Sequence, residues 1–429
     1  MREEALRVLV IDATHGGLTL SEAFAKRGHE VTCVDVYGTL KPSVADECSK
    51  TFQVRHGLPS SFDGYDLIVA PVHHPLPRDP GGRVVTHHEA VKMLVGDRID
   101  FPVVEVTGSF GKTTSIRCAI SLLRERHSVL SLMSGEVVFV DKEEERILMR
   151  GNSTTPANVI KALELCPRRP DLAIFEVSLG GTGLADLGVI KNVYDNYPIA
   201  KGTSCALEAK LSMVRNRKPG GLTLLNADDP SLRGIPGSQY FSTEGRTCEV
   251  RAEQVRVSPE GVEVAVEFRG FHTIDGPVHS RMLVRALGPV GRQHVENLVV
   301  GVSVARFLDG DLEGEVEVPR LAFGDRMVMK DPACPLVLNR SPAVNEKVLE
   351  RSMRDFLELF PPTRLEVGGR LRTTCGRVSP EGLARVINRS PFGEVFPFGE
   401  MGEAVRPLLK KPVGSPERKR VPTLRVERA

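Results

Sequence analysis

The residues with the clearest chemical potential form one glycine-rich run, Gly108-Ser109-Phe110-Gly111-Lys112-Thr113-Thr114. Glycines in such a run let backbone N–H groups turn inward and hold phosphate oxygens. Lys112 supplies a positive charge for the β- and γ-phosphates, and the hydroxyl of Thr113 suits Mg²⁺. The strict form of this loop has a glycine where Val106 stands, so Gly108 begins a variant of it. The run predicts a nucleotide site that takes ATP and Mg²⁺.

Histidines are a second group with chemical potential. Seven of the eleven lie in the first 88 residues: His15, His29, His56, His73, His74, His87 and His88. Histidine is a common metal ligand and a mild cation. One hypothesis is that His15, His73 and His74 meet an anionic or metal-bearing substrate. The alternative is a set of scattered surface and loop histidines.

The elements around the glycine-rich run suit phosphate binding. An apolar strand is expected at 101–106 and an amphipathic helix from the run to about 126, so the positive end of a helix dipole would face the phosphates. Downstream, the pattern predicts a helix over 157–165 with Thr155 as N-cap and Pro156 at its first position. Further elements are expected as strands at 172–177, 221–225 and 336–338, a hairpin at 248–268, and helices at 207–217, 294–308 and 344–359.

The first hundred residues read as a strand, a glycine turn, a helix and a second strand, the order that opens a Rossmann unit. The full dinucleotide glycine pattern is missing, so these glycines are interpreted as packing positions. The tail from Arg406 carries eight basic and two acidic residues. It is interpreted as a solvated or frayed end rather than an anion site.

Composition bounds the function. The chain has 429 residues and a formal net charge of +2, which argues against a protein that coats nucleic acid or an anionic membrane. Trp is absent and aromatic residues make up 5%, so base-stacking platforms are not expected. The eight cysteines form no C-x-x-C pair, and no export signal or membrane span is apparent, which fits a reducing cytoplasm.

Several further segments, taken with the glycine-rich run, resemble the Mur ligase superfamily, which includes peptidoglycan amino-acid ligases and folylpolyglutamate synthases. They occur in the family's order between about residues 100 and 345: Thr154-Thr155-Pro156, Phe175-Glu176-Val177-Ser178, Glu208-Ala209-Lys210, Asn226-Ala227-Asp228-Asp229-Pro230, Gly291 to Asn297, and Gly324-Asp325-Arg326-Met327. The resemblance implies an α/β protein of three domains. A central P-loop ATPase domain (101–320) would lie between two Rossmann-like domains, an N-terminal substrate domain (1–100) and a C-terminal one (321–429).

The resemblance also implies roles for single residues. Thr154 and Thr155 would face the substrate, Glu176 would bind Mg²⁺, and Lys210 would be carbamylated and hold metal near the γ-phosphate. Asn226 would lie beside the adenine. The remaining nucleotide contacts implied by the matching segments are Asn297 and Arg326. The plainer alternatives are a surface acid at Glu176, a solvated Lys210 and a turn residue at Asn226.

Two segments depart from the family pattern. Asp195-Asn196 replaces an acid–histidine pair, so a histidine metal ligand is lost, although Asn196 can still offer a carbonyl oxygen to Mg²⁺. Asn339-Arg340-Ser341-Pro342 replaces a segment whose aspartate reaches the ribose, which leaves Asn339 at that position. Nothing in the N-terminal unit suits a UDP-sugar, so peptidoglycan work is not expected.

The segments 10–17 and 34–39 resemble one branch of the family, the Mur-like enzymes of methanogens that complete coenzyme F-430, a nickel tetrapyrrole. This implies that ATP activates a propionate of a seco-acid precursor as an acyl phosphate, with Lys112, Glu176 and Lys210 as catalytic residues. A ring carbon would then close a carbocycle and release ADP and phosphate. The alternatives are a carboxylate–amine ligase that adds an amino acid and a P-loop ATPase without ligation. The expected partner is a small anionic nickel tetrapyrrole, with no nucleic acid and no membrane.

Overall fold

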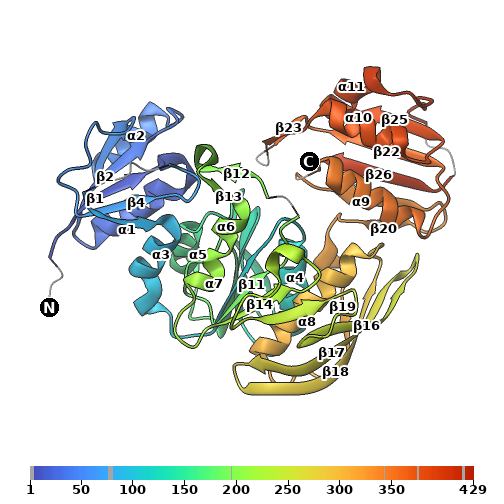
Figure 1. Ribbon diagram of the computed structural model, residues 1–429, viewed down its shortest axis with the longest axis horizontal. Coiled ribbons are helices and arrows are strands. Elements are labelled where there is room, and N and C mark those ends of the chain that lie inside the picture. Colours follow the sequence, from blue (N-terminus) through green and yellow to red (C-terminus); the bar gives the residue numbers. More distant parts are fainter. Residues whose placement is uncertain (1–3, 76–80, 195, 343, 374–375, 418–420) are drawn as a thin grey trace. The chain divides into compact units, whose positions relative to one another are not determined.

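The computed structural model describes residues 4–75, 81–194, 196–342, 344–373, 376–417 and 421–429. The chain divides into two compact units (Figure 1). The first comprises Met1–Val250, Arg269–His279 and Ser303–Leu312, and the second comprises Arg251–Phe268, Ser280–Val302 and Glu313–Ala429. Within the described ranges, the helices are too short or too polar to cross a membrane.

The first unit begins with a five-stranded sheet in the order β3-β2-β1-β4-β5, drawn in blue in Figure 1. All neighbouring strands run parallel, which gives the Rossmann order. The central strands are buried because apolar side chains meet packing on both faces. The elements are β1 (Arg7–Ile11), α1 (Leu18–Lys26), β2 (Glu30–Asp35), α2 (Pro42–Cys48), β3 (Gln53–His56), β4 (Leu67–Ala70), β5 (Arg83–Thr86) and α3 (His87–Val95).

The glycine-rich run follows β6, a strand of the next sheet, in which the strands of the first unit have the order β15-β14-β11-β6-β10-β7-β8-β9. Strands β15 to β7 in that order run parallel, and β7-β8-β9 are antiparallel. Parallel strands bring their carboxyl ends to one edge, the usual place for a ligand site. The strands are β6 (Val103–Thr107), β7 (Val129–Met133), β8 (Glu136–Val140), β9 (Glu145–Arg150), β10 (Leu172–Glu176), β11 (Leu187–Ile190), β14 (Leu222–Asn226) and β15 (Gln239–Ser242).

Helices α4 to α7 and the small hairpin of β12 and β13 accompany this sheet (Figure 1). Helix α4 begins at Lys112, directly after the glycine-rich run, as expected. The elements are α4 (Lys112–Leu123), α5 (Asn158–Leu165), β12 (Pro198–Ile199), β13 (Ser204–Cys205), α6 (Ala206–Lys210) and α7 (Ser212–Arg215). The single helix expected over 207–217 is therefore wrong, because the chain forms two short helices joined at Leu211.

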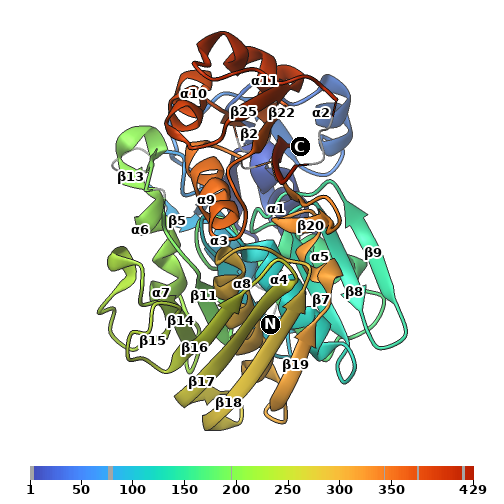
Figure 2. The same ribbon diagram turned by 90° about the vertical axis from the view of Figure 1, so that its right-hand side faces the viewer.

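Long neighbouring strands continue the chain, and Figure 2 shows β16, β17 and β18 as an extended ribbon beside β19. The hairpin expected at 248–268 is confirmed, since β16 and β17 are neighbours joined at Ser258–Glu260. The elements are β16 (Val250–Val257), β17 (Gly261–Thr273), β18 (Gly276–Leu287), α8 (Gln293–Leu308) and β19 (Gly314–Val318).

The chain ends in a second five-stranded sheet, in the order β20-β21-β26-β22-β25. Strand β26, formed by the basic tail, is its central strand and pairs in parallel with both neighbours. A solvated or frayed tail is therefore wrong, because Leu424 and Val426 are fully buried. The elements are β20 (Val328–Asp331), β21 (Leu336–Arg340), α9 (Glu346–Leu357), β22 (Arg364–Gly369), α10 (Pro380–Arg389), β25 (Glu394–Phe398), α11 (Gly399–Val405) and β26 (Thr423–Arg428).

Two local expectations also need correction. Thr155 does not cap α5, since the N-cap residue is Ala157 and its side chain makes no capping bond. His87 and His88 are not loop histidines, because they begin α3 and are buried.

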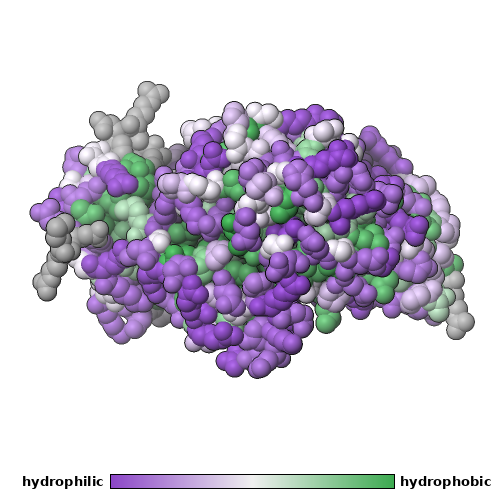
Figure 3. All heavy atoms as spheres, turned by 90° about the horizontal axis from the view of Figure 1, so that it is seen from below, coloured by the Kyte–Doolittle hydropathy of each residue, from purple (hydrophilic) through white to green (hydrophobic). Residues whose placement is uncertain are grey.

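Hydrophilic residues cover most of the face in Figure 3, with hydrophobic residues in separate small groups. The α/β class with a P-loop sheet and two Rossmann-like sheets is confirmed.

Candidate active site

The phosphate loop joins the buried strand β6 to helix α4. Gly108 and Gly111 have φ values of 152° and 78°, which strongly favour glycine. A Cβ on Gly108 would lie 3.1 Å from Cβ of Lys191 and 3.3 Å from the backbone N of Asn192. The loop backbone is therefore tightly packed, and it leads directly into the first turn of α4, whose N–H groups have no partner within the helix and can bind phosphate.

Glu176 brings together the reactive side chains of this loop. It is buried at the end of β10, the strand beside β6. The hydroxyl of Thr113 donates to its Oε2 at 2.6 Å, and Nζ of Lys112 lies 3.5 Å from its Oε1. The backbone N–H of Ser134 also donates to Oε2 at 3.2 Å, while Nζ of Lys112 donates to the carbonyl of Gly108 at 3.0 Å. A hydroxyl and a carboxylate this close fit Mg²⁺, which prefers oxygen ligands.

Asn192 holds the loop in shape and was missed from the sequence. Its Oδ1 accepts the backbone N–H groups of Ser109 at 2.9 Å and Phe110 at 3.0 Å, and its Nδ2 donates to the carbonyl of Phe110 at 3.2 Å. Asn192 follows β11, the other neighbour of β6. A polar residue just past a buried parallel strand was the available signal.

The segment expected to face the substrate contacts both the phosphate site and the N-terminal sheet. Thr154 Oγ1 lies 2.6 Å from the hydroxyl of Ser178, two residues after Glu176. On the other side, a Cβ on Gly16 would lie 3.5 Å from Oγ1 of Thr155 and 2.7 Å from Cβ of Ala157. The loop that begins at Asp12 thus packs directly on the Thr154–Ala157 segment.

Two of the predicted histidines converge on Asp12, a buried acid that the sequence did not single out. Its Oδ2 lies 2.7 Å from Nδ1 of His15 and 3.0 Å from Nε2 of His73. Burial alone would raise the pKa of Asp12, but the hydrogen bonds from His15 and His73 outweigh it and hold that pKa well below its usual range. The hydrogen bond to Asp12 in turn raises the pKa of His15.

The other histidines of this region are less available. Burial lowers the pKa of His74 and lowers the pKa values of His87 and His88 to about 4. The Nε2 atoms of His87 and His88 bond the carbonyls of Ile11 and Ser178, each at 2.8 Å. These two rings are therefore neutral donors that tie α3 to the site.

Three further predicted residues of the first unit contact other groups of the protein. Lys210 in α6 is 3% exposed, with Nζ 5.8 Å from the ring centre of Tyr197. The side chain of Asn226 donates to the carbonyl of Lys191 at 3.0 Å and accepts from the N–H of Asp228 at 2.8 Å, as a turn residue does. Asn196 Oδ1 accepts the N–H of Leu207 at 3.0 Å. Its predicted companion at position 195 lies outside the described residues.

The last three predicted nucleotide contacts belong to the second unit. Asn297 Nδ2 lies 3.2 Å from Nδ1 of His294 within α8. Asn339 is the second-last residue of β21 and is buried, and its Nδ2 donates to the hydroxyl of Ser352 on α9 at 2.7 Å. The backbone N–H of Arg326 donates to the carbonyl of Phe323 at 3.1 Å.

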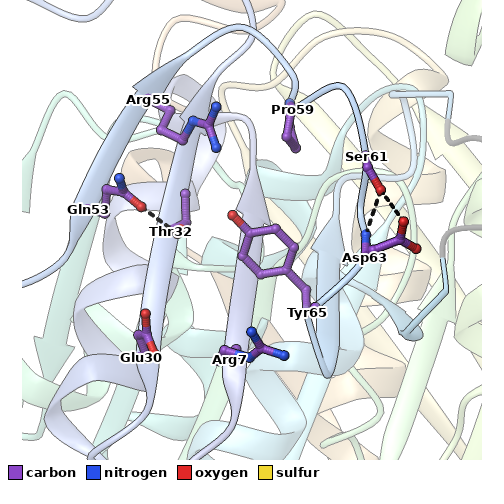
Figure 4. A pocket seen from close by; sticks show the side chains of 10 residues that line it. Arg7, Glu30, Thr32, Gln53, Arg55, Pro59, Ser61, Asp63 and Tyr65 are labelled. Atoms are coloured by element: carbon purple, nitrogen blue, oxygen red, sulfur yellow. Dashed lines mark hydrogen bonds between the residues drawn. The ribbon is translucent and has the colours of Figure 1, made fainter.

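A polar pocket lies elsewhere, on the N-terminal sheet (Figure 4). Arg7, Thr32 and Arg55 extend from β1, β2 and β3, and Tyr65 closes the other side. Gln53 accepts from Thr32 at 3.1 Å, and Ser61 donates to Asp63 at 2.6 Å. The residues predicted for nucleotide, metal and substrate are not among those that line it.

Comparison with known proteins gives two kinds of likeness. No family model matches the chain. The coenzyme F(430) synthetase of Methanosarcina acetivorans is 35% identical over 247 residues, a match that covers 54% of this chain and about half, 52%, of that relative. The coenzyme F(430) synthetase of Methanocaldococcus jannaschii is 25% identical over 412 residues, covering 92% of this chain and 91% of the relative.

Solved structures show the fold. The MurF ligase of Thermotoga maritima, in complex with ADP, superposes with a TM-score of 0.57 at 16% identity, over 93% of this chain and 91% of that one. A MurF from Acinetobacter baumannii gives a TM-score of 0.55 at 14% identity, over 98% of this chain and 89% of that one. The architecture described above is that of the Mur ligases.

Proposed function

We propose that the chain is a member of the Mur ligase superfamily and an ATP-dependent ligase that activates a substrate carboxylate as an acyl phosphate, a proposal supported by the likeness to coenzyme F(430) synthetases and by the Mur ligase fold. The observation that carries the proposal is the meeting of Lys112, Thr113 and Glu176 at the carboxyl edge of the P-loop sheet. A simple phosphate-binding loop needs no buried carboxylate on its hydroxyl. A metal-assisted phosphoryl transfer site does.

These contacts support the proposed first half of the reaction. The N–H groups of the loop and Nζ of Lys112 would hold the β- and γ-phosphates of ATP and neutralise the γ-phosphate oxygens as that group moves to the substrate carboxylate. Thr113 and Glu176 would hold Mg²⁺, which supplies further neutralisation of phosphate charge. Asn192 holds the loop backbone in place, because its Oδ1 accepts the N–H groups of Ser109 and Phe110.

We assign the substrate from the likeness to coenzyme F(430) synthetases, which extends over 92% of the chain in one relative. The activated group is then a propionate of a nickel tetrapyrrole. A ring carbon displaces phosphate and closes a carbocycle, so no amino acid is consumed. In this proposal residues 1–100 form the substrate domain, and Thr154 and Thr155 connect it to the phosphate site.

The proposal is tested by ADP release from purified protein given ATP and Mg²⁺. Release that requires the seco-acid nickel precursor and no amine is the expected result. Release that requires an amino acid instead would favour the second candidate, a carboxylate–amine ligase. That candidate is favoured by a 25% identical relative, the UDP-N-acetylmuramoylalanine–D-glutamate ligase of Pelotomaculum thermopropionicum, which matches 70% of this chain. Turnover with neither substrate would overturn both.

A further inference from the structure

Asp12 fixes two imidazoles that come from different segments of the first unit. Its Oδ1 accepts the backbone N–H groups of Thr14 and His15, each at 3.1 Å. Its Oδ2 receives Nδ1 of His15 at 2.7 Å and Nε2 of His73 at 3.0 Å. An ionised carboxylate only accepts, so each ring must donate an N–H toward it. Four donors therefore saturate Asp12, which acts as an acceptor for the two rings.

This arrangement leaves the far nitrogen of His15 as a base. With Nδ1 protonated toward Asp12, Nε2 carries the lone pair of the neutral ring. The side chain of His15 is 47% exposed, and the described residues include no hydrogen-bond partner for its Nε2. The other titratable rings that face it are His73 and Tyr37, edge-on at 5.2 and 5.5 Å between ring centres.

The position of His15 connects it to the phosphate site. The next residue, Gly16, packs against Thr155 and Ala157, as the approach of 2.7 Å between a Gly16 Cβ and Cβ of Ala157 shows. One residue before Thr155, Thr154 contacts Ser178, which follows Glu176 by two residues. A substrate that reached from the Thr154–Thr155 segment toward the N-terminal sheet would meet the His15 ring on this loop.

We propose that His15 is the general base of the second half-reaction and that Asp12 is its positioning residue. The inference rests on the proposed ring closure. Nε2 of His15 takes the proton of the attacking carbon, and the electron pair of that C–H bond forms the new bond to the acyl carbon. The bond between the acyl carbon and the phosphate oxygen breaks, and phosphate leaves with its electron pair. The proton passes from His15 to water after the product departs.

The test separates activation from closure. Purified wild-type and His15→Gln proteins receive ATP, Mg²⁺ and the open nickel precursor, with hydroxylamine to trap the acyl phosphate as a hydroxamate in one arm and without it in the other. The variant is expected to form hydroxamate within about threefold of wild type and to close the ring at least about 100-fold more slowly, as loss of a general base predicts. His56→Gln is the matched control, because His56 also faces a buried aspartate, Asp35 at 3.7 Å, and should close the ring normally.

Asp12→Asn adds a readout that a purely structural role would not move. Closure falls at low pH as Nε2 of His15 becomes protonated. Without the Asp12 carboxylate the pKa of His15 falls, so this loss of closure shifts to lower pH. An unshifted profile would overturn the positioning role.

Four other outcomes overturn the assignment of His15 as the general base. If His15→Gln closes the ring at the wild-type rate, His15 is not the general base, and the proposed function is unaffected. If His15→Gln loses hydroxamate formation and ring closure together, His15 binds substrate instead. If wild type binds a stoichiometric divalent metal that His15→Gln alone fails to bind, His15 holds a metal instead. Wild-type protein that forms no hydroxamate overturns the proposed function and the inference with it.

Discussion

At the scale of single residues, the candidate site depends on how one carboxylate, Glu176, is shared between a hydroxyl and an ammonium group. The residue types around it could be predicted, because Gly108, Lys112 and Thr113 lie in one short run. Asn192 and Asp12 could not, since each matters only through contacts with distant segments: Asn192 lies 82 residues from Phe110, and Asp12 lies 61 from His73. The roles given to Lys210, Asn297 and Arg326 remain predictions.

Lys112→Ala should lower the turnover number at least about 100-fold, because it removes the only side-chain cation in the loop run itself. Lys142→Ala is the matched control, since Lys142 is exposed on the turn between β8 and β9. ADP release under saturating ATP measures both. A Lys112→Ala protein with wild-type turnover would contradict the phosphate-loop assignment.

Glu176→Gln should keep the hydrogen bond from Thr113 but lose the negative charge that attracts Mg²⁺. The Mg²⁺ concentration at the midpoint of ATP binding should therefore rise by roughly 10-fold or more. Titration of ATP binding against Mg²⁺ concentration measures this. Glu143→Gln, an exposed position, should bind like wild type. An unchanged Mg²⁺ midpoint for Glu176→Gln would place the metal elsewhere.

At the scale of elements, parallel strands were predictable where they are short apolar runs after a turn, and this held for β1, β6, β10 and β14. The prediction of a solvated or frayed tail was wrong because charged residues dominate the composition of the segment from Arg406, while strand β26 occupies only its last residues. Alternation in Leu424, Val426 and Arg428 is too short to separate a central strand from a loop. The break between α6 and α7 likewise has no glycine or proline to announce it.

Leu424→Ala should destabilise the second unit by about 2–5 kcal/mol, because it opens a cavity in a fully buried central strand. Leu408→Ala, at a site 38% exposed, should have little effect. Denaturant unfolding followed by proteolysis of the C-terminal sheet would compare the two. Equal stabilities would argue that β26 does not pack in the sheet core.

Glu105, in the middle of β6, makes stability depend on pH. Burial raises its pKa from 4.5 to about 7, against hydrogen bonds from the N–H and hydroxyl of Thr182. The folded state therefore holds this proton more tightly than the unfolded state, and the associated stability is present below pH 4.5 and lost as pH rises through about 7.

Glu105→Gln keeps the shape and hydrogen bonds without the titration. It should equal wild type in thermal midpoint near pH 4.5 and be more stable near pH 8, by roughly 1–3 kcal/mol. Unfolding scans of both proteins across this range provide the measurement. If the stability of wild type rises relative to that of Glu105→Gln as pH increases, the raised pKa of Glu105 is contradicted.

At the scale of the whole molecule, we propose that a substrate carboxylate, rather than water, takes the γ-phosphate of ATP. The α/β class and the Mur ligase fold could be predicted because several motifs occur in order along one chain. The nickel tetrapyrrole was predicted only through the resemblance of segments 10–17 and 34–39 to one branch of the family, and it remains a prediction.

The most direct test of that claim uses a precursor whose reacting carboxylate carries ¹⁸O at both oxygens. If the carboxylate attacks the γ-phosphate and phosphate then leaves from the acyl carbon, one ¹⁸O atom must appear in the phosphate released in each turnover. This is the expected result whether carbon or an amine completes the reaction. Phosphate that contains no label from the carboxylate would mean that ATP is hydrolysed directly, and would contradict the account.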